Sequence, residues 1–220
     1  MNGQGTRALA RTGPANAEYG LVALHGRGGS AADILGLVNA LGLPDVAAVA
    51  PEARGRSWWP TSFLAPHAEV QPHLDRALLA VEEGVAALRA QGLASEKIGV
   101  LGFSQGACLA AEYVARKGGP LLGLWAFSGA LIGTGDAEGQ GQERLYGYGP
   151  KRFDGYAELT GVPAYISCHE ADPHIPVHRV RESVDVFAAQ GAKVETIIYP
   201  GPGHSIRTDD IAALRAALNT

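Results

Sequence analysis

Apolar positions along the chain fall into short continuous runs, and longer stretches with helical spacing lie between them. Strands that are buried on both faces of a parallel sheet are apolar nearly throughout. Runs of this kind occupy residues 20–24, 46–50, 98–103, 122–127, 162–167 and 194–199. Their alternation with helical segments predicts an α/β fold, in which helices flank both faces of a mostly parallel sheet.

The helical segments are marked by their start signals and their spacing. Ser30 and Asp33 form a capping-box pattern that starts a helix running to about residue 41. Leucine and valine at i, i+4 and i+7 spacing mark one face of a helix over 72–90. Further helices are expected over 105–117, 177–190 and 208–218. Residues 133–155 are glycine-rich and aperiodic, which predicts a long loop, either at a site entrance or on the surface.

Composition limits the class of protein. A chain of 220 residues suits one domain, taken here as 1–220, and its net charge of −4 comes without the cationic stripe that a nucleic-acid partner requires. No apolar segment reaches the roughly 20 residues of a membrane span, and residues 1–11 do not resemble a secretory signal. Cys108 and Cys168 are expected to be reduced thiols of a cytoplasmic protein.

The strongest chemical signal is the segment Gly102-Phe103-Ser104-Gln105-Gly106. It follows a predicted strand and opens a predicted helix, as a G-x-S-x-G nucleophile elbow does. A serine on such a tight turn approaches other backbone closely, so its neighbours must lack side chains. The segment therefore predicts that Ser104 is a nucleophile rather than an ordinary capping serine.

A serine hydroxyl needs a general base, and the base needs an acid to orient it. His204 follows the last predicted strand and precedes the last helix, at the carboxyl edge of the sheet. Asp172 lies in the loop after the preceding strand, where a proline turn would fix its direction. Glu170 is the alternative acid. The order Ser104, Asp172, His204 is the one expected for this fold.

Negative charge that develops on a carbonyl oxygen requires backbone donors. We expect one donor to be the N–H of Gln105, directly after the nucleophile. We expect the other to be the N–H of Arg27, in a glycine-rich loop after the first predicted strand. Gly26 and Gly28 would let this loop approach a substrate, and His25 would brace it.

The same loop also fits a dinucleotide-binding fingerprint. Gly26-x-Gly28-x-x-Ala31 lies between a strand and a helix, and Glu52 follows the second strand, where a ribose ligand would be. That reading leaves the serine, aspartate and histidine unexplained. A phosphate-binding loop is less favoured, because the closing Lys-Ser/Thr is missing. A non-catalytic binding protein on a hydrolase scaffold also stays open.

A metal site is not expected from the sequence. His169, His174 and His178 lie close together, but Pro176 interrupts any shared helix face, and no other ligand pattern accompanies them.

Taken together, these motifs resemble the phospholipase/carboxylesterase family of α/β-hydrolases, which includes the acyl-protein thioesterases. The resemblance covers about residues 19–218 and includes Asp172 with Pro176 four residues on. It implies a cofactor-free serine esterase that is a monomer or a homodimer and acts on small-molecule esters. Thioesterase or lysophospholipase activity is the alternative on the same triad. The run Arg27-Gly28-Gly29 is closer to the small bacterial carboxylesterases.

The aromatic segment of the chain is similar to one in those carboxylesterases. It contains Trp58, Trp59 and Phe63. These side chains would either pack in the core or form a wall of the substrate pocket.

Overall fold

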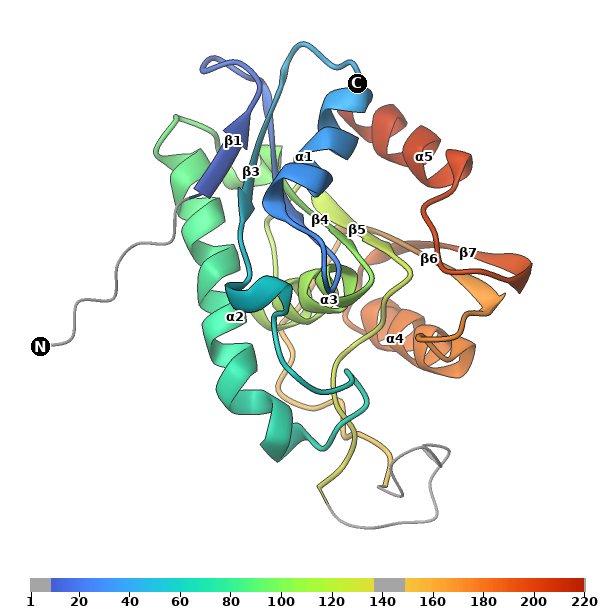
Figure 1. Cartoon of the computed structure of the whole chain (residues 1–220). Coiled ribbons are helices and arrows are strands. Elements are labelled where there is room, and N and C mark those ends of the chain that lie inside the picture. Colours follow the sequence, from blue (N-terminus) through green and yellow to red (C-terminus); the bar gives the residue numbers. More distant parts are fainter. Residues whose placement is uncertain (1–8, 137–148, 220) are drawn as a thin grey trace, which may run out of the picture.

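The computed structural model describes residues 9–136 and 149–219. Within these ranges the strands form one sheet in the order β1-β3-β2-β4-β5-β6-β7 (Figure 1). Strand β1 runs antiparallel to β3, and the other neighbouring strands are parallel. The predicted fold class is therefore confirmed. The strands are β1 (Leu9–Thr12), β2 (Tyr19–Leu24), β3 (Val46–Pro51), β4 (Ile98–Phe103), β5 (Gly123–Phe127), β6 (Pro163–Ala171) and β7 (Lys193–Pro202).

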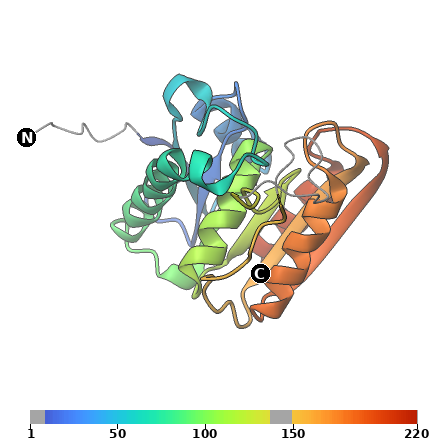
Figure 2. The same ribbon diagram turned by 90° about the horizontal axis from the view of Figure 1, so that it is seen from below.

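Helices cover both faces of the sheet. Figure 2 shows α2, α3 and α4 in a row along one face, where their apolar side chains form one core cluster with the sheet. Helices α1 and α5 bury a second cluster against the other face. The helices are α1 (Ala31–Ala40), α2 (His67–Arg89), α3 (Gln105–Lys117), α4 (Val177–Ala189) and α5 (Thr208–Leu218), and two short turns are η1 (Arg54–Arg56) and η2 (Ser95–Lys97).

The clearest differences from the sequence prediction concern β1, α2 and β6. Strand β1 was not predicted, because four residues at a sheet edge carry too little apolar pattern. Helix α2 begins at His67 rather than at residue 72, so Pro72 lies inside it. Proline lacks an N–H and usually marks the first turn of a helix, so the predicted start at residue 72 followed this preference and was wrong. Strand β6 continues past residue 167 to Ala171, through the polar residues His169 and Glu170.

A buried acid anchors the flanks of the predicted long loop. Glu112 on α3 is fully buried and contacts Lys151 at 3.1 Å and Arg116 at 2.8 Å, and it accepts the N–H of Ile132 at 3.0 Å. Burial would raise the pKa of Glu112, but these two cations outweigh burial and hold the pKa below its ordinary value. Residues 133–136 and 149–155 of the predicted loop are described, and 137–148 lie outside the described residues.

Parallel strands bring distant parts of the chain to one edge. The carboxyl ends of β2, β4, β6 and β7 lead into the loops that hold the candidate chemistry. No helix in the described part of the chain is long and apolar enough to cross a bilayer.

Candidate active site

Ser104 lies on a sharp turn between β4 and α3. Its φ of 55° is in the left-handed region, which few side chains adopt. A Cβ at Gly102 would lie 2.2 Å from the carbonyl oxygen of Gly106, and a Cβ at Gly106 would lie 2.2 Å from that of Leu24. Only glycine fits at either position, so the two glycines are the reason that the chain can turn here.

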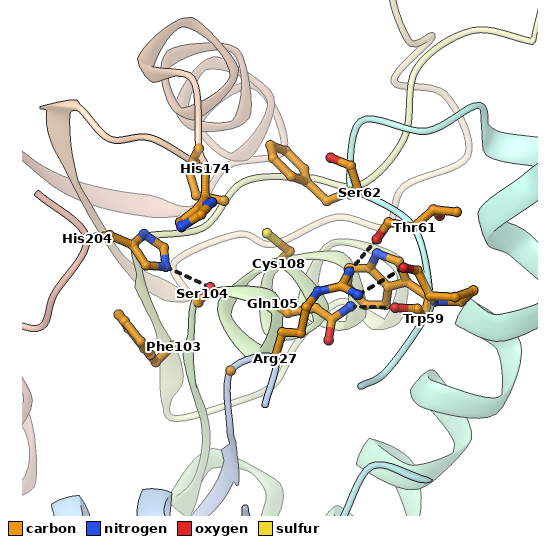
Figure 3. Close-up of a pocket in the computed structure, with 14 residues that line it drawn as sticks. Arg27, Trp59, Thr61, Ser62, Phe103, Ser104, Gln105, Cys108, His174 and His204 are labelled. Carbon is orange, nitrogen blue, oxygen red and sulfur yellow. Dashed lines mark hydrogen bonds between the residues drawn. The ribbon is translucent and has the colours of Figure 1, made fainter. Parts of the chain in front are cut away.

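His204 joins Ser104 to Asp172. Its Nε2 lies 2.8 Å from the Ser104 hydroxyl oxygen, and its Nδ1 lies 2.7 Å from Oδ2 of Asp172. The dashed line in Figure 3 marks the first of these bonds. These three residues come from α3's N-terminus, the end of β6 and the end of β7. A neutral imidazole with its proton on Nδ1 donates to the carboxylate and accepts from the serine.

Asp172 is held by three further donors. Its Oδ1 accepts the backbone N–H groups of His174 at 2.8 Å and Ile175 at 3.0 Å. The thiol of Cys168 lies 3.6 Å from Oδ2. Burial acts to raise the pKa of Asp172, but its bonds to His204 and the two N–H groups outweigh burial and lower the pKa. The alternative acid, Glu170, is exposed, and within the described residues no hydrogen bond or ion pair joins it to His204.

The loop after β2 packs against the serine. A Cβ at Gly26 would lie 3.2 Å from Cβ of Ser104, so the backbone of this loop passes close to the candidate nucleophile. His25 is buried; its Nδ1 lies 2.8 Å from the Gly26 carbonyl, and its Nε2 accepts the Ala53 N–H at 3.1 Å. His25 therefore braces the loop. Arg27 and Gln105 line one cavity together with Ser104.

Two side chains fix the aromatic segment to this centre. The buried amide of Gln105 accepts the N–H of Trp58 at 3.0 Å and donates to the carbonyl of Trp59 at 2.9 Å. The guanidinium of Arg27 donates to the carbonyl of Pro60 at 2.9 Å and to that of Thr61. These roles could not be predicted from the sequence, because both depend on a loop that is more than 30 residues away.

The cavity beside Ser104 has a volume of about 480 Å³. Of the predicted substrate-binding residues, it is lined by Gly26, Trp59 and Phe63 but not by Trp58. The Trp58 ring packs on His25 with centroids 5.1 Å apart, and its indole N–H donates to the His25 carbonyl at 2.9 Å. The structure therefore places Trp58 beneath the loop rather than in the wall. Lining residues that the sequence did not predict include Phe103, Cys108, His174 and Ile175.

His174 is the most informative of these additions. Its ring packs edge-on against His204 with centroids 4.8 Å apart, and it is exposed. The sequence suggested it only as a weak metal ligand. Among residues 9–136 and 149–219, no group of three or more potential ligands is placed to hold a metal ion.

The dinucleotide alternative fits this geometry poorly. Glu52 accepts the N–H of Ala31 at 2.6 Å, and Ser30 caps the same helix by accepting the N–H of Asp33 at 3.2 Å. A pyrophosphate on this fingerprint would need those same N–H groups at the start of α1. The carboxylate that would bind a ribose is thus already used by the protein.

Comparison with known proteins places the chain in a family. The model of the phospholipase/carboxylesterase family matches residues 16–142. The chain belongs to the phospholipase/carboxylesterase family. A family member from Dyadobacter fermentans, described as a phospholipase/carboxylesterase, is 39% identical over 98% of this chain and 97% of its own, with a TM-score of 0.85.

Two more distant solved structures share the fold of this chain. Esterase PE8 is 23% identical, covers 96% of each chain and has a TM-score of 0.73. A Bacillus cereus carboxylesterase is 15% identical over 98% of this chain and 95% of its own, with a TM-score of 0.71. The search of curated proteins found no match. Membership in the phospholipase/carboxylesterase family supports a hydrolase.

Proposed function

We propose that the protein is a serine carboxylesterase that hydrolyses small carboxylic esters through an acyl-enzyme on Ser104. The observation that carries this proposal is the continuous hydrogen-bonded series from Ser104 through His204 to Asp172, with distances of 2.8 and 2.7 Å. Family membership supports the hydrolase class, and the site supports the serine chemistry.

In the first half of the reaction, the Ser104 oxygen attacks the ester carbonyl while Nε2 of His204 takes the hydroxyl proton. Asp172 holds the imidazole in the required tautomer and stabilises the imidazolium that forms. The backbone N–H groups of Arg27 and Gln105 are the proposed donors to the oxyanion. His204 then gives its proton to the departing alcohol.

In the second half, a water molecule replaces the alcohol. His204 takes a proton from this water, which attacks the acyl carbonyl, and the Ser104 oxygen leaves with that proton. The acid product departs and the resting hydroxyl is restored. No cofactor enters either half of the proposed reaction.

Replacement of Ser104 tests the proposal. Ser104→Ala should lower kcat for p-nitrophenyl butyrate by about 10⁴–10⁶, as in comparable triads. A fluorophosphonate should label the wild-type protein but not this variant. Ser205 is an exposed serine beside the histidine, so Ser205→Ala is the matched control and should keep both properties. Full turnover by Ser104→Ala would refute the proposal.

A further inference from the structure

One wall of the cavity beside Ser104 is rich in hydrogen-bond donors. Arg27, Trp59 and Thr61 lie together on this side in Figure 3, and His174 and His204 lie on the other side of Ser104. The indole N–H of Trp59 is buried out of reach of the cavity, so the guanidinium of Arg27 is the charged donor on this wall that a ligand can meet.

The guanidinium of Arg27 is already oriented. Two of its N–H groups donate to the carbonyls of Pro60 and Thr61, which leaves further N–H groups for a ligand. Carbonyl partners fix the direction of the group without neutralising its charge. A side chain that is ordered beforehand loses less entropy when it binds.

Negative charge is missing from the same cavity. None of its lining residues is aspartate or glutamate, and Arg27 forms no ion pair with any acid in the described chain. The nearest carboxylate of the site, Asp172, is occupied by His204. A wall with a cation but no acid fits a group that only accepts hydrogen bonds, and an ionised carboxylate is such a group.

The position of the base assigns this group to one part of the ester. His204 must lie beside the leaving alcohol, because it gives that alcohol its proton. The donor-rich wall lies across Ser104 from His204, so it faces the acyl part. We propose that the preferred substrates are esters whose acyl group ends in a carboxylate, that is, half-esters of dicarboxylic acids. This inference rests on the proposed esterase function.

The test compares two esters of the same length. The half-ester p-nitrophenyl hydrogen adipate carries the carboxylate, and p-nitrophenyl adipamate has a neutral amide in its place. The wild-type protein should favour the adipate half-ester by about tenfold in kcat/KM, after subtraction of the uncatalysed rate. The preference should shrink as salt is added, because ions screen the charge of Arg27.

Variants assign the preference to a residue. Arg27→Met keeps the backbone N–H but removes the charge, so the adipate-to-adipamate ratio should fall to about one. Arg27→Lys keeps the charge without the planar fork and should keep part of the preference. Arg54 is exposed and lies outside this cavity, so Arg54→Met is the matched control and should keep the full ratio. Because each ratio is measured within one variant, a general loss of activity does not alter it.

The outcomes separate this inference from the proposed function. Equal turnover of both adipate esters by an enzyme that still depends on Ser104 would overturn the inference and leave the esterase proposal standing. Persistence of the preference in Arg27→Met would also overturn it. A preference for p-acetoxybenzoate over its amide, without one for adipate, would refute the assignment to the acyl side. Turnover that survives Ser104→Ala would instead refute the esterase proposal.

Discussion

The amide of Gln105 should control the geometry of the cavity wall, and Gln105→Met tests this directly. Methionine has a similar length but cannot bond to the backbone of Trp58 and Trp59. The carbonyl of Trp59 keeps one partner, because the Ser57 hydroxyl donates to it at 2.6 Å. The N–H of Trp58 loses the partner at 3.0 Å. The predicted loss of stability is therefore that of one buried donor, about 1–3 kcal/mol.

A loss of this size leaves the protein folded, since domains are typically stable by about 5–15 kcal/mol. The loss of catalytic rate should be larger than the loss of stability suggests. A shift of about 1 Å in a group that positions the substrate can cost 10²-fold in rate. We therefore expect kcat/KM to fall by about 10- to 100-fold, with a greater loss for bulky esters that contact Trp59 than for p-nitrophenyl acetate.

Denaturant unfolding and steady-state kinetics on the same preparations measure both effects. Gln91 is exposed at the end of a helix, so Gln91→Met is the control and should match the wild type. Gln105→Glu adds a pH test, because the protonated carboxyl restores both bonds while the ionised form cannot donate to Trp59. Its deficit relative to wild type should thus shrink as the pH falls. Wild-type stability and kinetics in Gln105→Met would refute the reasoning.

Three further predictions concern the stability of the protein at low pH, the turn that holds Ser104 and the buried Glu112 on α3. The pKa of Asp172 is lowered in the folded protein, so the ionised carboxylate stabilises the fold. This stabilisation is complete above the ordinary carboxyl pKa and is lost as the pH falls through the lowered pKa. Acid unfolding of Asp172→Asn, compared with that of the wild type, measures it. Gly106→Ala places a Cβ 2.2 Å from a carbonyl oxygen, so it should abolish fluorophosphonate labelling, whereas Gly36→Ala, where nothing lies within 4 Å, should keep it. Glu112→Ala should lower the free energy of unfolding by about 3–5 kcal/mol, measured in urea, because it leaves Lys151 buried without its partner acid; a loss under 1 kcal/mol would count against it.

Local patterns carried much of the fold. The strands β2 to β7 and the starts of α1, α3 and α4 follow from apolar runs, a capping box and prolines, which act over a few residues. Strand β1 depends on pairing with β3, more than 30 residues away, and four residues cannot reveal that pairing. The part of α2 on the N-terminal side of Pro72 likewise depends on packing against the rest of the fold rather than on local preference.

The same division applies to the site. Ser104, Asp172 and His204 stand next to strand ends, so the topology alone predicted that they meet. Three-dimensional contacts decided the rest. The packing of His174 on His204 and the burial of Trp58 under His25 depend on which loops face each other. No spacing along the chain encodes either contact.

The strand order has a consequence for how the protein acquires activity. The serine lies in the first half of the chain, whereas the aspartate and histidine follow β6 and β7 on the far side of the sheet. Domains begin to fold from the N-terminus during synthesis, so the elbow can form before its base exists. Ester hydrolysis would begin only when β7 has docked. On the ribosome, the nascent chain would therefore carry a serine that is not yet reactive. The first appearance of ester hydrolysis would show when the fold is complete.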